Sequence, residues 1–149
     1  MQFDIPTPLK VEHEHLHADL AKATKEDGRT GEAARSVAGI LHPHFVKEEE
    51  FALPPLGLLN RLAQGEVVPE METVLGMTDR LKAELHHMLE EHKAIVDALK
   101  NLADAARKEG KTEYLDFSKD LILHAQTEEE VLYPAAILIG EYVKAKLNR

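Results

Sequence analysis

HFVKEEEFALP, at residues 44–54, is matched by HAQTEEEVLYP at residues 124–134. The histidine, the three glutamates and the proline all recur at one offset, because 124 − 44, 128 − 48 and 134 − 54 each give 80. Residues four apart on an α-helix lie on the same face, so each histidine lies beside the first glutamate of its triplet. An imidazole and a carboxylate directed at one point suit a divalent transition metal such as iron, manganese or zinc. Two copies predict two metals or one shared cluster.

The repeat extends towards the N-terminal side of each half. Glu12-His13 begins one copy and Glu91-His92 the other, and apolar residues match at plus three and plus seven from each histidine. The spacing from His13 to His44 is 31 residues, and that from His92 to His124 is 32. Each half therefore contains a histidine, a connection, and then His-x-x-x-Glu. Internal duplication explains this better than chance placement of nine histidines.

Length and composition narrow the class of protein. A chain of 149 residues fits a single domain over residues 1–149 with a sizeable core. The absence of cysteine excludes disulfides, thiolate metal sites and iron–sulfur clusters. The first residues have neither the basic region nor the apolar run of a signal peptide, and no apolar run reaches membrane-spanning length. A net charge of −9 disfavours nucleic acid as a partner. We therefore expect a cytoplasmic protein that does not bind nucleic acid or a membrane.

Four helices are predicted along the chain. Few aromatic residues, glycines at the breaks and many Ala, Leu, Glu and Lys residues indicate an all-α protein. The first helix begins at Thr7-Pro8, and the second is opened by Thr30-Gly31 and ended or kinked by Pro54-Pro55. A short extra helix is expected over 56–65, a long third helix from Val68 to about Gly110 with a bend or break around Gly76, and a fourth helix from about Thr112, kinked at Pro134. Short loops between them favour an antiparallel up-down four-helix bundle.

The candidate metal ligands share a position at the centre of this bundle: His13, His44, Glu48, His92, His124 and Glu128. One His-x-x-x-Glu alone is a weak sign, because exposed helices often carry such pairs. Here both copies are flanked by apolar residues; Phe117, Leu121 and Val131 lie at positions that place them on the same helical face as His124. Buried carboxylates are costly unless they are paired or metal-bound, so a cation is expected between them. The competing interpretation is a helical bundle with incidental surface histidines.

The other histidines and Met88 are weighed against these six. His17 lies four residues after His13 and is either an additional histidine ligand or part of the pocket lining; its counterpart in the second half is Val96. His15 and His42 are expected at the surface. His86 and His87 lie off the face of His92 and are interpreted as structural or exposed, with an approach to the site through a helix irregularity as the alternative. Met88, one turn before His92, is expected to pack against the metal pocket rather than to bind metal.

Acidic residues next to the ligands have two interpretations. Glu49 and Glu129 lie about 140° from the first glutamate of each triplet, so a solvated position is favoured, with hydrogen bonding to the ligands as the alternative. Glu50 and Glu130 are expected on the solvated face. Asp120, one turn before His124, either accepts the second imidazole N–H of that histidine or is an ordinary surface residue.

Taken together, Glu12-His13, His44-x-x-x-Glu48-Glu49, Glu91-His92 and His124-x-x-x-Glu128-Glu129 resemble the hemerythrin-like family, also called HHE cation-binding domains. The resemblance covers nearly the whole sequence. It implies a four-helix bundle with two non-haem iron ions, bridged by the two glutamates and by an oxo or hydroxo group. The histidines would divide between the metals. Zinc or manganese would be substitutes.

Two departures from the family pattern bear on function. The oxygen-carrying members have a second histidine one turn before the third-helix ligand, where this chain has Met88, and an aspartate five residues after the last histidine, where it has Glu129. These differences disfavour reversible oxygen transport. We expect a protein that binds or senses O₂, NO or peroxide. The alternatives are a peroxide-consuming or oxidase-like enzyme and a protein of iron storage or homeostasis. The case for an enzyme is thin, because the only proton-delivering candidates are His17 and Tyr133.

Overall fold

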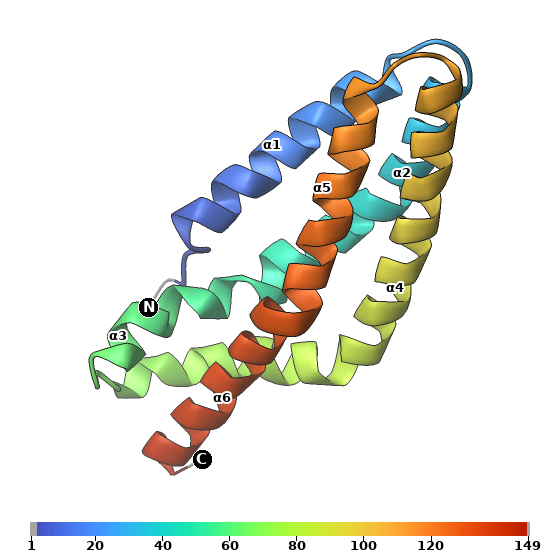
Figure 1. The fold of residues 1–149 in the computed structure, drawn as a ribbon. Helices are drawn as coiled ribbons and strands as arrows, with labels where there is room; N and C mark the ends of the chain where they lie inside the picture. The colour runs from blue at the N-terminus through green and yellow to red at the C-terminus, as the bar shows by residue number, and fades with distance from the viewer. Residues whose placement is uncertain (1–2, 149) are drawn as a thin grey trace.

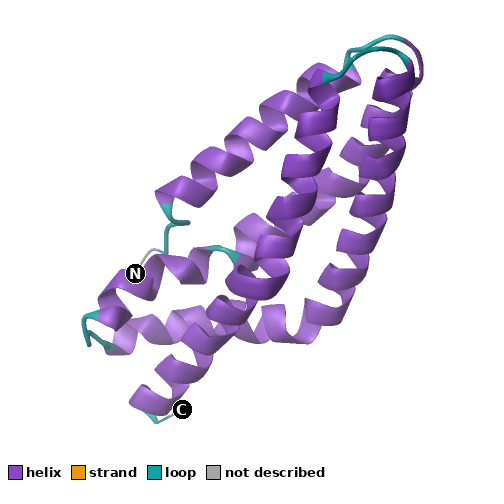
Figure 2. Cartoon of the chain, viewed as in Figure 1, coloured by secondary structure: helices purple, strands orange, loops and turns teal. Residues whose placement is uncertain are grey.

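The computed structural model describes residues 3–148, which form an antiparallel bundle of long helices (Figure 1). Its long elements are α1 (Thr7–Thr24), α2 (Gly28–Lys47), α4 (Val74–Lys108) and α5 (Glu113–Thr127). Neighbours pack in a closed ring, α1 on α2, α2 on α4, α4 on α5 and α5 on α1. The loops that join α1 to α2 and α4 to α5 lie at the same end (Figure 2). The all-α, four-helix prediction is confirmed, and no β-strand occurs within 3–148.

The connection between the second and third long helices contains the short extra helix that the sequence predicts. It comprises η2 (Pro54–Leu58), a 3₁₀ turn, α3 (Leu59–Ala63) and η3 (Pro69–Thr73), another 3₁₀ turn. In Figure 1 this segment covers the end of the bundle opposite the α1–α2 loop.

The bend or break expected around Gly76 does not lie at the glycine itself, because α4 is continuous from Val74 to Lys108. The irregular part comes earlier, where the 3₁₀ turn passes into the α-helix at Thr73 and Val74. A single glycine in a helix costs only about 1 kcal/mol relative to alanine, which the packing of a 35-residue helix absorbs. Figure 1 instead shows α4 changing direction farther along, between a first part that lies near α6 and a second part that joins the bundle.

Each half of the repeat contains one π-helical turn directly after its His-x-x-x-Glu motif. The turns are η1 (Glu48–Ala52) and η4 (Glu128–Leu132), and α6 (Tyr133–Leu147) continues from the second. The Leu53 N–H donates to the Glu48 carbonyl at 2.9 Å, a bond that spans five residues rather than four. Each turn precedes a proline, whose ring would clash with the carbonyl four residues back in a continuous α-helix. The wider turn relieves that conflict.

These turns change which residues face the core. The prediction that Val131 shares the inward face of His124 is wrong, since Val131 is 56% exposed. The prediction assumed 100° per residue throughout, whereas five residues complete the turn after Glu128. Residue 133, and not 131 or 132, returns to the face of Glu128, and Tyr133 is fully buried.

Two apolar clusters fill the interior, one on each side of the repeated motifs. The first includes Leu20, Leu41, Leu99 and Phe117 and lies towards the α1–α2 loop. The second includes Phe51, Leu56, Met71, Leu81, Met88 and Ile139, from η1, η2, η3, α4 and α6. The polar residues of the motifs are buried between them. No helix within 3–148 is long and apolar enough to cross a membrane.

Candidate metal centre

All six predicted ligands are buried in the middle of the bundle. Each long helix contributes one histidine, and the π turns η1 and η4 contribute the glutamates: His13, His44, Glu48, His92, His124 and Glu128. None is more than 6% exposed. Their atoms fall into two groups that meet at one carboxylate.

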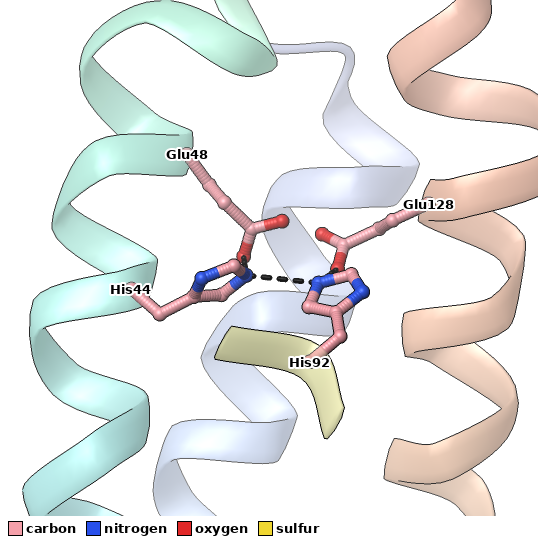
Figure 3. Close-up of side chains that lie close together, drawn as sticks. All are labelled: His44, Glu48, His92 and Glu128. Carbon is pink, nitrogen blue, oxygen red and sulfur yellow. Dashed lines mark hydrogen bonds and ion pairs between the residues drawn. The ribbon is translucent and has the colours of Figure 1, made fainter. Parts of the chain in front are cut away.

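The first group consists of His44, Glu48, His92 and Glu128. Figure 3 shows these four side chains pointing towards one another from three parts of the chain. The Nε2 atoms of His44 and His92 are 2.9 Å apart. Glu48 Oε1 lies 3.6 Å from the His44 Nε2, and Glu128 Oε1 lies 3.2 Å from the His92 Nε2. Two imidazole nitrogens and two carboxylates therefore face one small volume.

The second group consists of His13, His124 and Glu128. The two imidazole Nε2 atoms are 3.3 Å apart, and Glu128 Oε2 lies 3.2 Å from that of His124 and 3.8 Å from that of His13. Glu48 Oε1 is 3.9 Å from the His13 Nε2. Glu128 thus directs one oxygen at each histidine pair, and Glu48 lies close to both pairs.

The carboxylates of Glu48 and Glu128 are buried without enough partners. Glu48 Oε1 and Glu128 Oε2 accept no hydrogen bond from the described residues. Burial raises the pKa of Glu48 well above its usual range, and the neighbouring Glu128 charge adds to this. Burial also opposes ionisation of Glu128, but the neighbouring Glu48 and the surrounding imidazoles hold the pKa of Glu128 well below its usual range. Two buried carboxylates this close oppose each other's ionisation, and a bound cation would supply the positive charge that they lack.

The outward-facing nitrogen of three of the four histidines contacts a further carboxylate. Glu129 Oε1 lies 3.0 Å from the Nδ1 of His92, and Glu91 Oε1 lies 3.3 Å from that of His44. For Glu129 the alternative interpretation, contact with a ligand, is therefore the one that the geometry supports. Such a carboxylate fixes the imidazole tautomer with Nδ1–H outward and the free Nε2 lone pair inward.

The same contact recurs at one of the other two histidines. Glu12 contacts the His124 Nδ1, and Glu49 Oε1 lies 3.8 Å from the His13 Nδ1, which is longer than a hydrogen bond. The exposed Asp120 does not hold this position at His124, because Glu12 of the neighbouring helix α1 reaches the nitrogen first. In each case the carboxylate belongs to a residue directly before or after another ligand.

This ligand arrangement agrees with the comparison to known families. The Hemerythrin HHE cation binding domain matches residues 5–136. The chain belongs to the hemerythrin HHE family. The resemblance inferred from the motifs is confirmed, and the family together with the buried His/Glu cluster indicates metal binding. No curated protein and no solved structure matches the chain.

One further side chain lies in this hemerythrin-like centre, and the sequence indicated it only as a possible proton donor, not as a neighbour of the ligands. The Tyr133 hydroxyl donates to Glu48 Oε2 at 2.8 Å and lies 3.2 Å from the Nε2 atoms of both His44 and His92. On a regular α-helix Tyr133 would lie about 140° from Glu128, outside the site. The only sequence signal was the proline after it, which made a regular helix improbable at this point.

The remaining histidines of this HHE domain lie outside both groups. His17 stacks on His42 with ring centroids 5.4 Å apart and packs its edge against Phe45. It lines a surface cavity of about 190 Å³ together with His13 and Glu49. His86 and His87 are exposed, as is His15. Met88 is fully buried in the second apolar cluster, next to the site along α4.

Proposed function

We propose that this HHE domain holds two iron ions and binds a small molecule, O₂, NO or peroxide, at that centre. The observation that carries the proposal is the position of Glu128, whose two oxygens face two different histidine pairs. A carboxylate so placed suits a bridge between two metals. Glu48 lies near both pairs in the same way.

The donor set fits iron. Four imidazole nitrogens and two carboxylates, with no thiolate, suit Fe, Mn or Zn. Six protein ligands leave open positions on two metals, and bound iron would supply redox chemistry and a binding position for a diatomic molecule or peroxide there. The carboxylates of Glu129, Glu91 and Glu12 would each hold an imidazole in one orientation, and the two apolar clusters would limit access of water to the site.

One observation favours a second candidate, a peroxide-consuming or oxidase-like enzyme. The Tyr133 O–H is a proton donor inside the centre, hydrogen-bonded to Glu48. A storage function is less well supported, because the described residues form two adjoining groups of buried donors rather than a large ion-holding cavity. The net charge of −9 supports a small molecule rather than nucleic acid as the partner.

Anaerobic loading with Fe(II), followed by elemental analysis, tests the centre. Wild-type protein should hold close to two irons per chain, and optical spectra should change on adding O₂, NO or peroxide in turn. Glu128→Ala should lose metal, whereas Glu130→Ala, two residues away on the exposed side of the same turn, should keep two irons. One iron per chain, or spectra that ignore all three additions, would refute the proposal. Sustained peroxide turnover would identify the enzyme.

A further inference from the structure

The two halves of the centre differ at one pair of positions. Tyr133 follows Glu128 by five residues, and its counterpart in the first half, Leu53, follows Glu48 by five. Each N–H donates to the carbonyl five residues back, and both side chains are buried, at 0% and 1% exposure. Only Tyr133 carries an oxygen. The two halves of the repeat therefore match in their six ligands and differ in the side chain five residues after each glutamate.

The position of the Tyr133 oxygen matches that of a ligand. Two donor atoms bound at about 2.1 Å to one ion lie about 3.0 Å apart at a right angle and about 3.4 Å apart at a tetrahedral angle. The phenol oxygen is 3.2 Å from the Nε2 atoms of both His44 and His92, and 2.8 Å from Glu48 Oε2. The two imidazole nitrogens are themselves 2.9 Å apart. The phenol oxygen and the two imidazole nitrogens are therefore spaced as neighbours around one metal, and Glu48 Oε2 lies beside the phenol oxygen.

Resting on the proposed di-iron function, we propose that Tyr133 is a protein ligand of the metal held by His44 and His92. On metal binding, the phenol would release to water the proton that it now donates to Glu48 in a hydrogen bond, and its oxygen would bond to the metal. That metal then has fewer open positions than its neighbour. The small molecule consequently binds to the metal held by His13 and His124.

Two surface cavities lie beside the second group of ligands and suit a path by which the small molecule enters. His13 lines the cavity of about 190 Å³ with Lys10, Glu14 and His17. His124 lines a second cavity of about 410 Å³ between α1 and α5. Both openings lead to the histidines of the group that Tyr133 does not approach.

Iron(III) alone is the probe for the tyrosine ligand. Loaded wild-type protein should show a visible phenolate-to-iron(III) charge-transfer band, with tyrosinate ring modes in resonance Raman spectra excited in that band. Tyr133→Phe should lose both while keeping two irons, since six ligands remain. Tyr114→Phe is the matched control: Tyr114 is equally buried but hydrogen-bonds to Glu26, at the far end of the bundle, and its loss should leave the band intact.

Wild-type protein with two irons and no such band would overturn the inference while leaving the proposed function standing. Failure to bind a second iron would count against the proposed function itself. The open side is tested with NO and the Fe(II) protein: His17→Trp, which fills the cavity beside His13, should slow NO binding at least several-fold. Val46→Trp, on an exposed position of α2, should not. Equal NO rates in wild type and folded His17→Trp would overturn the assignment of the open metal.

Discussion

Replacing Glu129 by glutamine should weaken metal binding without removing a ligand. The carboxylate lies 3.0 Å from the His92 Nδ1, and it holds the ring so that Nε2 points into the first group. Loss of such a partner usually lowers metal affinity about 10- to 100-fold. Glutamine keeps an oxygen that can accept the Nδ1–H bond but loses the charge, and Glu129 is partly exposed. We therefore expect the lower limit, about tenfold or about 1.4 kcal/mol.

The assay is competition for Zn²⁺ or Fe²⁺ against a chelator of known affinity. Glu130→Gln is the matched control, because Glu130 is the next residue and is exposed, so its affinity should equal that of wild type. Glu49→Gln should fall between them, since Glu49 lies 3.8 Å from the His13 Nδ1. Wild-type affinity in Glu129→Gln would refute the reasoning that this carboxylate supports the ligand.

Three further outcomes are expected. Burial raises the pKa of Glu48, so the folded apo-protein takes up a proton at Glu48 and loses stability as the pH rises above the ordinary carboxyl pKa of 4.5. Glu48→Gln should therefore raise the thermal midpoint of the apo-protein at pH 7 but not at pH 4. The same variant should bind less metal. Chelation of the metal should lower the thermal midpoint of the wild-type protein. The stability lost is about 2.7 kcal/mol if the free metal had been at 100 times its Kd. An unchanged midpoint would contradict a stabilising role of the metal. Gly31→Ala should destabilise the folded protein by about 1–3 kcal/mol, because the added Cβ would clash with the Glu26 carbonyl. Gly39→Ala in the same helix meets open space and should stabilise the folded protein by up to about 1 kcal/mol. Denaturant unfolding measures both changes in stability.

Those features of the site that follow from the internal repeat and from the period of the α-helix could be predicted from the sequence. The offset between the two His-x-x-x-Glu motifs predicts that His44, Glu48, His124 and Glu128 share one interior, and the structure brings them together. Within each motif, the face on which the histidine and the glutamate lie depends only on their spacing along one helix, and helical backbone geometry determines that face.

Contacts between helices were harder to predict. Glu12 reaches His124 across the α1–α5 interface, and Asp120, the nearer residue in sequence, does not hold that position. Which helix supplies an outer carboxylate depends on the axial stagger of neighbouring helices, and no pattern within either segment encodes it. Tyr133 was named from the sequence as a possible proton donor, but its position among the ligands was not predicted, because a helical wheel with a constant angle per residue cannot represent a turn of five.

The π turns also bear on how the chain tolerates changes in its length. On α5 the buried side chains before Glu128 follow the ordinary spacing of three and four, at Phe117, Leu121 and His124. On α6 they resume at Tyr133 and Ala136, one residue later than an uninterrupted helix would place them. In this turn, five residues therefore cover the rotation about the helix axis that four residues cover in an ordinary α-helix. A chain that lacked one of residues 129–132 and had a residue other than proline at position 134 could close this turn as ordinary α-helix and still present the same face of α6 to the core. With both changes, the turn is a place where a residue can be lost without rotating the rest of the helix.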